Sequence, residues 1–190
     1  VGVRLLPQGF AVTGKALTLE EGREGERPLH IAPSDFQFEY VPGKAGQATS
    51  AKLTANALDL GALARLAGHL PLEARWHQAL KDYAPQGRLR EVNASWKGDA
   101  AQWQSYTLKT RFDALALHAQ GDIPGFSGLN GSLEANEKGG NVSLNAQASS
   151  IDLPGVFPVS LTRLDALNLN ARWTRGAEGL RVELQKMDFP

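Results

Sequence analysis

Cysteine and net charge are what this sequence most plainly lacks. None of its 190 residues is cysteine, and 20 basic residues balance 20 acidic ones to give a formal net charge of +0. The lack of cysteine excludes disulfides, thiolate metal ligands and cysteine nucleophiles, but it fits a cytosolic protein as well as a periplasmic one. The lack of a positive field argues against nucleic-acid binding, which depends on basic side chains that neutralise phosphates.

Long apolar runs are missing as well. No stretch of about 18 consecutive apolar residues is present, so we expect no membrane-spanning helix in this chain. The chain begins at Val1 without a methionine and ends at Pro190 in the middle of a strand-like pattern. We therefore expect a segment of a larger protein, whose membrane contacts lie only in parts absent from this chain.

Motifs that carry catalysis or bind metals are also missing. The four histidines do not have the spacing of zinc ligands, and there is neither a nucleophile elbow nor a phosphate-binding loop. Ser127 follows Gly125-Phe126 in a predicted loop between strands, which is the wrong context for a serine nucleophile. We expect that the chain is not an enzyme, and that it uses no metal ion or other cofactor.

Alternation of apolar and polar residues is the main pattern that is present. Tyr106, Leu108, Thr110 and Phe112 alternate with polar residues, as in a half-buried strand. Two later segments predict hairpins, because paired alternating runs flank glycine-rich turns. The first hairpin joins the runs 129–135 and 142–148, and the second joins 167–173 and 180–184. We expect about nine strands of six to eight residues, most of them joined by short loops into an antiparallel meander.

One interval has helical spacing instead. Asp59 is a plausible N-cap for a first helix, and a second helix carries an apolar stripe that includes Trp76 and Leu80 and ends before Pro85. The predicted organisation is a single unit over 1–190, with strands in 1–58, a helical hairpin in 59–84 and an antiparallel β meander in 85–190. The predicted fold class is mainly β: a long, strongly curved antiparallel sheet shaped like a groove or trough, with two short helices that cap it or pack on it.

Several turn sequences, in this order, resemble those of a known family. They are Leu58-Asp59-Leu60-Gly61-Ala62-Leu63, His69-Leu70-Pro71-Leu72, Tyr83-Ala84-Pro85-Gln86-Gly87-Arg88-Leu89, Val92-Asn93-Ala94-Ser95-Trp96, Tyr106-Thr107-Leu108-Lys109-Thr110-Arg111-Phe112, Pro124-Gly125-Phe126-Ser127-Gly128-Leu129-Asn130-Gly131, Leu153-Pro154-Gly155-Val156-Phe157 and Leu167-Asn168-Leu169-Asn170-Ala171-Arg172-Trp173. The segment 58–173 resembles the central domain of the YhdP-type branch of the AsmA-like envelope proteins.

The resemblance implies a function as well as a fold. Members of that family look like β-sheet troughs in the periplasm of Gram-negative bacteria, anchored in the inner membrane and linked to carrying phospholipid toward the outer membrane. On that basis we expect a lipid-binding or lipid-conducting β-groove that serves phospholipid transport and outer-membrane integrity. Its partners would be phospholipid, or another acyl-chain lipid, and the flanking segments of the full-length protein, with no nucleic acid. The family offers no catalytic residues to transfer.

Two alternatives remain at this stage. A structural or protein-interaction β-scaffold of the envelope would pack the same apolar faces into a closed core. An enzyme, such as a carbohydrate-active β-sandwich, would need carboxylates clustered in a cleft.

For the groove, alternation predicts which side chains face the apolar interior, and a register error of one residue would reverse that choice. The predicted lipid-facing residues are Leu108, Phe112, Leu133, Val142, Leu144, Leu169 and Val182. Trp76 and Leu80 are candidates for a plug or gate at one end, with core packing as the simpler reading.

Overall fold

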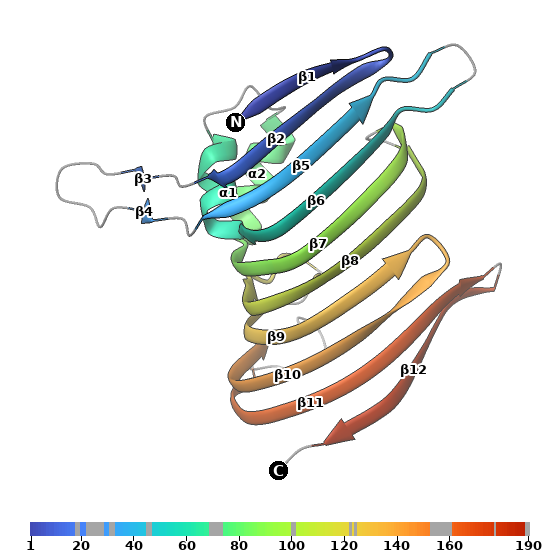
Figure 1. The fold of residues 1–190 in the computed structure, drawn as a ribbon. Helices are drawn as coiled ribbons and strands as arrows, with labels where there is room; N and C mark the ends of the chain where they lie inside the picture. Colours follow the sequence, from blue (N-terminus) through green and yellow to red (C-terminus); the bar gives the residue numbers. More distant parts are fainter. Residues whose placement is uncertain are drawn as a thin grey trace.

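The fold is one long antiparallel sheet with a helical hairpin packed against the ends of strands in its first half (Figure 1). The computed structural model describes residues 1–17, 20–21, 29–30, 33–44, 47–68, 74–99, 102–121, 123, 125–152, 161–176 and 178–188. Its elements are β1 (Gly2–Leu6), β2 (Gly9–Leu17), β3 (Glu20–Glu21), β4 (Leu29–His30), β5 (Ser34–Val41), β6 (Ser50–Asp59), α1 (Leu60–Gly68), α2 (Ala74–Tyr83), β7 (Gln86–Asp99), β8 (Gln102–Leu117), β9 (Gly125–Asn136), β10 (Gly139–Asp152), β11 (Leu161–Gly176) and β12 (Gly179–Asp188).

The main sheet has ten strands in the order β1-β2-β5-β6-β7-β8-β9-β10-β11-β12, and every neighbouring pair is antiparallel. β3 and β4 form a separate two-stranded pair. The sheet is open, and Figure 1 shows its strands curving toward the side on which the helices lie. The predicted fold class is therefore confirmed: a mainly β protein with a long antiparallel sheet and two short helices.

The strands differ from the prediction in number and in length. The main sheet has ten strands where the sequence predicted about nine, and β1 was not singled out because five residues give only two alternating apolar positions. β8 and β11 each run for 16 residues, about twice the expected length. The reason is that bulges interrupt the alternation within these strands without ending them.

Two bulges show how the long strands keep their apolar side chains on one face. Glu91 in β7 and Ala114 in β8 have positive φ values of 52° and 49°, at points where the strand registers shift. An extra residue at a bulge reverses the alternation. Leu115 therefore joins Phe112, three residues before it, in one apolar cluster.

The helical hairpin falls within the interval predicted for it, and α1 begins as expected. The Oδ1 atom of Asp59 accepts a hydrogen bond of 2.9 Å from the Ala62 amide, which is the N-cap interaction. Ala62 is 0% exposed because α1 packs on β6 and β7. At the end of α2, the carbonyl oxygen of Tyr83 accepts a hydrogen bond of 2.8 Å from the His118 amide, which ties this helix to the chain after β8. Among the described helices, none is long and apolar enough to cross a membrane.

Candidate functional site

The most distinctive feature of the sheet is a row of uncharged side chains that crosses all ten strands. Each residue of this row is register-paired with the next, so the row runs at right angles to the strands. In strand order it consists of Val3, Val12, Phe38, Leu53, Ala94, Leu108, Ala135, Gly140, Trp173 and Val182. We call this set the ten-strand row.

A second row runs parallel to it on the same face. Leu58, Leu89, Phe112, Gly131, Leu144 and Leu169 are paired in succession from β6 to β11. Phe112 is 4% exposed and packs with Leu129, which is 6% exposed, although no second sheet among the described strands covers them. Seven partly buried side chains of the same sheet pack against this pair, so neighbouring side chains of one face cover it.

Glycines do not interrupt these rows. A Cβ atom at Gly131 would collide with the Phe112 ring and with the carbonyl oxygen of Ser143, and one at Gly140 would collide with the Trp173 ring. Each aromatic ring therefore occupies the space above a glycine of the adjacent strand. This arrangement keeps the apolar surface continuous where a side chain is absent.

Aromatic rings gather on the part of this face that belongs to the first strands. The ring of Phe10 lies 5.4 Å from that of Tyr40 and 6.2 Å from that of Phe38, and the Phe38 ring lies 6.2 Å from that of Trp96. The strands from β8 to β11 supply mainly leucine, valine and alanine to the same face. The face is thus uncharged throughout its paired rows. Its aromatic rings cluster at the first strands, whereas from β8 to β11 the rows contain only two aromatic residues, Phe112 and Trp173.

The opposite face is polar along its whole width. A row parallel to the ten-strand row consists of Thr13, Gln37, Thr54, Asn93, Lys109, Glu134, Asn141, Arg172 and Glu183. Lys109 forms a salt bridge with Glu134, and Arg172 donates a hydrogen bond of 2.9 Å to Asn141. Such cross-strand pairs stabilise the sheet on its solvent side.

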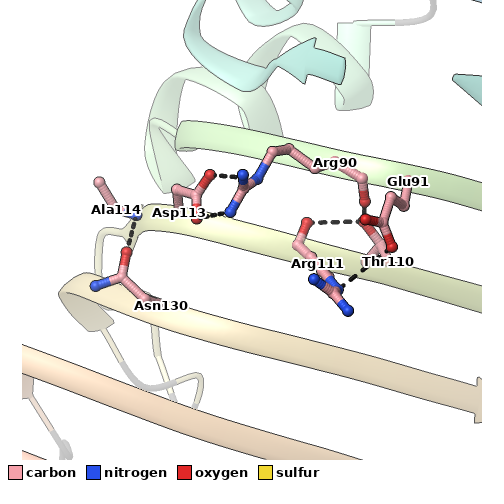
Figure 2. A network of polar contacts seen from close by, with 7 residues as sticks. All are labelled: Arg90, Glu91, Thr110, Arg111, Asp113, Ala114 and Asn130. Carbon is pink, nitrogen blue, oxygen red and sulfur yellow. Dashed lines mark hydrogen bonds and ion pairs between the residues drawn. The ribbon is translucent and has the colours of Figure 1, made fainter. Parts of the chain in front are cut away.

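Polar groups near the bulges are satisfied by neighbouring strands, as Figure 2 shows. The hydroxyl of Thr110, which belongs to the apolar face and is 4% exposed, donates to the carbonyl oxygen of Arg90 at 3.1 Å. The Ala114 amide donates to Asn130 Oδ1 at 2.8 Å, and Arg90 forms an ion pair with Asp113 on the polar side. These contacts remove the unpaired polar atoms that a bulge would otherwise present to the groove.

α1 encloses part of the apolar face. A pocket of about 360 Å³ lies between this helix and β2, β5 and β6. Its walls are Val12, Ser34, Phe36, Phe38, Leu53, Leu58, Asp59, Ala62, Leu63 and Leu66. The pocket is within the size range of small-molecule sites and its lining is almost wholly apolar.

The predicted lipid-facing residues fall into two groups. The structure brings Phe112, Leu133, Val142, Leu144 and Leu169 together in the cluster around Phe112 and Leu129. Leu108 and Val182 belong to the ten-strand row, and Val182 is 58% exposed because β12 is an edge strand. Contact of these residues with lipid stays a prediction.

The two predicted plug residues lie on α2 and do not line the pocket under α1. Trp76 is 45% exposed, with the Arg75 guanidinium carbon 5.3 Å from its ring centroid, and Leu80 lines a pocket between the two helices. The helical side chains that line the apolar pocket are Ala62, Leu63 and Leu66 of α1, which were not among the predicted lipid-facing or plug residues. The spacing of three residues between Leu63 and Leu66 on an amphipathic helix was the available signal.

No catalytic arrangement emerges from the described part of the chain. It contains no group of three or more His, Asp or Glu side chains that could hold a metal ion. Ser127 lies in β9, where its hydroxyl is 2.6 Å from that of Ser150 on β10, so it is a strand residue rather than a loop residue.

A family model described as "YhdP protein" matches residues 2–190, which is nearly the whole chain. Searches of curated proteins and of solved structures found no match.

Proposed function

Because the chain belongs to the YhdP protein family, we propose that it is a non-enzymatic, lipid-binding segment of a periplasmic protein of the AsmA-like group. In this proposal the apolar face holds the acyl chains of phospholipid, and the segment forms one length of a conduit toward the outer membrane. The full-length protein would be anchored in the inner membrane of a Gram-negative bacterium, and its flanking segments would extend the sheet at β1 and β12.

The observation that carries the proposal is the ten-strand row. An uncharged path that crosses every strand of an open sheet offers an acyl chain continuous contact from one edge to the other. Nine strand spacings of about 4.8 Å give a path of about 43 Å, roughly three times the 15 Å depth of one leaflet's acyl layer. The path is therefore longer than one bound chain, as transfer along it requires.

The energetics favour transient binding over storage. Burying one methylene is worth about 0.8 kcal/mol, so a chain of roughly 14 methylenes would gain about 11 kcal/mol if fully enclosed. On an open face about half of that chain stays in water, which leaves about 5–6 kcal/mol. Association itself costs at least about 4 kcal/mol. An open groove thus binds an acyl chain weakly enough to release it, which suits a conduit.

The scaffold alternative required the apolar faces to pack into a closed core. The described sheet is open, and α1 encloses a pocket over part of that face. This arrangement favours the groove.

The direct test is native mass spectrometry of the purified chain after incubation with phospholipid, with organic extraction of whatever co-purifies. We expect stoichiometric lipid on the wild-type protein and its loss in Leu144→Asp, because the new carboxylate would lie on the apolar face. Ser143→Asp is the matched control, since Ser143 neighbours Leu144 on β10 and is exposed on the opposite face. A folded wild-type protein that stays free of lipid, or equal binding by the two variants, would contradict the proposal.

A further inference from the structure

α1 separates two pockets of opposite chemical character. One is the apolar pocket of about 360 Å³ described above, which Leu63 and Leu66 line. The other has a volume of about 570 Å³ and lies between α1 and α2. Its walls are Ala64, Arg65, Gly68, Ala74, His77, Gln78, Leu80 and Lys81. The two sides of one short helix thus face an apolar and a basic environment.

Basic side chains line the second pocket, although the chain as a whole has a formal net charge of +0. Arg65 and Lys81 contribute two cations and His77 adds an imidazole, whereas no carboxylate is among the lining residues. The nearby carboxylate of Asp82 accepts a hydrogen bond of 2.6 Å from Gln78 Nε2. In the described residues no ion pair neutralises Arg65 or Lys81. The pocket is therefore suited to an anion.

The apolar pocket has the complementary property. Its lining contains no cationic side chain, and its only charged group is Asp59, whose carboxylate caps α1. An acidic group at that position repels a phosphate or a carboxylate, so the pocket favours the methyl end of a chain over a charged headgroup. The charge distribution thus favours the apolar end of an amphiphile on one side of α1 and its anionic end on the other side.

We propose that the helical hairpin holds one anionic phospholipid beside the first strands of the groove, with its phosphate at Arg65, His77 and Lys81 and an acyl chain in the pocket under Leu63 and Leu66. This inference rests on the proposed function and adds a headgroup site to it.

The distances are compatible with one molecule. The headgroup layer of a bilayer extends about 5–8 Å beyond each side of the hydrocarbon core, and a helix with its side chains is about 10 Å across. With the acyl layer of one leaflet, about 15 Å, a lipid is about 20–23 Å long, so a molecule that crosses α1 with its phosphate on the far side still leaves roughly 10 Å of chain for the apolar pocket. Arginine and lysine both bind phosphate oxygens through charge-assisted hydrogen bonds.

The test compares two lipids with identical acyl chains, phosphatidylglycerol and phosphatidylcholine, mixed in equal amounts and offered to the protein before native mass spectrometry. We expect the wild-type protein to bind phosphatidylglycerol in about three- to tenfold excess, as partly exposed charge pairs allow. The double variant Arg65→Glu/Lys81→Glu should lose this preference while it keeps the wild-type amount of total lipid. Lys97→Glu/Lys138→Glu makes the same change of charge at exposed positions outside this pocket, and it should keep the preference.

Each result separates the headgroup site from the groove. A preference unchanged in Arg65→Glu/Lys81→Glu would overturn the headgroup site and leave lipid binding by the groove in place. Absence of lipid on the wild-type protein would instead remove the proposed function itself. Titration of the lipid-free protein with inorganic phosphate tests whether the basic pocket binds free phosphate. If the basic pocket binds phosphate but does not affect lipid preference, it serves a free phosphate and the lipid assignment is wrong.

A second variant keeps the test independent of the charge changes. Leu66→Asp places a carboxylate in the apolar pocket without altering Arg65, His77 or Lys81. It should lower phosphatidylglycerol binding at the hairpin by about tenfold, while the chain-binding face from β8 to β11 is untouched. Circular dichroism and thermal unfolding establish that each variant compared is folded, and Arg65→Gln/Lys81→Gln replaces the double variant if the glutamates disturb the helices.

Discussion

At the scale of single residues, the apolar face depends on positions where a side chain is absent. Gly131 lies between Phe112 and Leu144 in the second row, and the Phe112 ring occupies the space above it. The backbone of β10 also approaches closely, because the carbonyl oxygen of Ser143 lies where a Cβ atom at position 131 would be. The buried Phe112 ring can therefore keep its position only while residue 131 has no Cβ atom.

We expect Gly131→Ala to lower the free energy of unfolding by about 1–3 kcal/mol, because overpacking displaces the Phe112 ring and the adjacent strand. The measurement is urea denaturation followed by tryptophan fluorescence. Gly176→Ala is the control, since no atom lies within 4 Å of a Cβ atom at that position. It should change stability by less than about 0.5 kcal/mol. Equal effects of the two changes would show that the close packing at Gly131 is unimportant.

At the scale of single elements, α1 is short and exposed on one side, so its cap contributes a large share of its stability. Replacing an N-cap aspartate by alanine costs about 0.5–2 kcal/mol, whereas asparagine is an equally good cap. We therefore expect Asp59→Ala to destabilise α1 and to weaken lipid capture in the pocket under this helix. Asp59→Asn should restore the stability.

The measurement is the helical signal in circular dichroism together with the thermal midpoint. If Asp59→Asn is as unstable as Asp59→Ala, the charge of Asp59 and not its capping hydrogen bond matters. If neither change has an effect, packing of Ala62 on the sheet suffices to hold α1.

The elements also show what the sequence could predict. Alternation placed Leu108, Phe112 and Leu144 on one face, because the period of a strand is fixed by its backbone. The cap at Asp59 and the stop before Pro85 located the hairpin. These features depend on residues close together in the chain.

What the sequence did not predict depends on pairing between distant residues. β7 and β8 are about twice as long as expected because bulges at Glu91 and Ala114 shift the alternation without ending the strand. The local signal for these bulges was a spacing of three residues, in place of two, between apolar residues of one face. This spacing separates Leu89 from Val92 and Phe112 from Leu115. Nothing local indicated that Leu63 and Leu66 would line a pocket with Phe36, which lies 27 residues before Leu63 in the chain.

At the scale of the whole molecule, the two edges of the sheet are exposed and apolar. On β12, Leu180, Val182 and Leu184 are 65%, 58% and 62% exposed, and on β1, Val3 and Leu5 are 69% and 84% exposed. Each edge strand pairs on one side only within the described sheet. Unpaired strands with apolar side chains associate readily with other strands.

We expect the isolated chain to self-associate with increasing concentration through these edges. Val182→Lys should weaken that association, because a charged side chain on an edge strand opposes pairing. Sedimentation velocity over a range of concentrations measures the effect. Ser143→Lys, on the polar face of a central strand, should leave the association unchanged. If the chain stays monomeric at every concentration, the edge strands β1 and β12 do not associate with other copies.

The ten-strand row has a kinetic consequence. Successive residues along it are similar in polarity and about one strand spacing apart, so a bound chain can move sideways by one strand while it exchanges one set of methyl contacts for an equivalent set. Outside the pocket under α1, which includes Val12, Phe38 and Leu53 of the row, we expect movement along the row to be a one-dimensional random walk over low barriers. Such a surface sets no direction of its own. In the proposed conduit, net flow would therefore have to come from unequal supply and removal of lipid at its two ends.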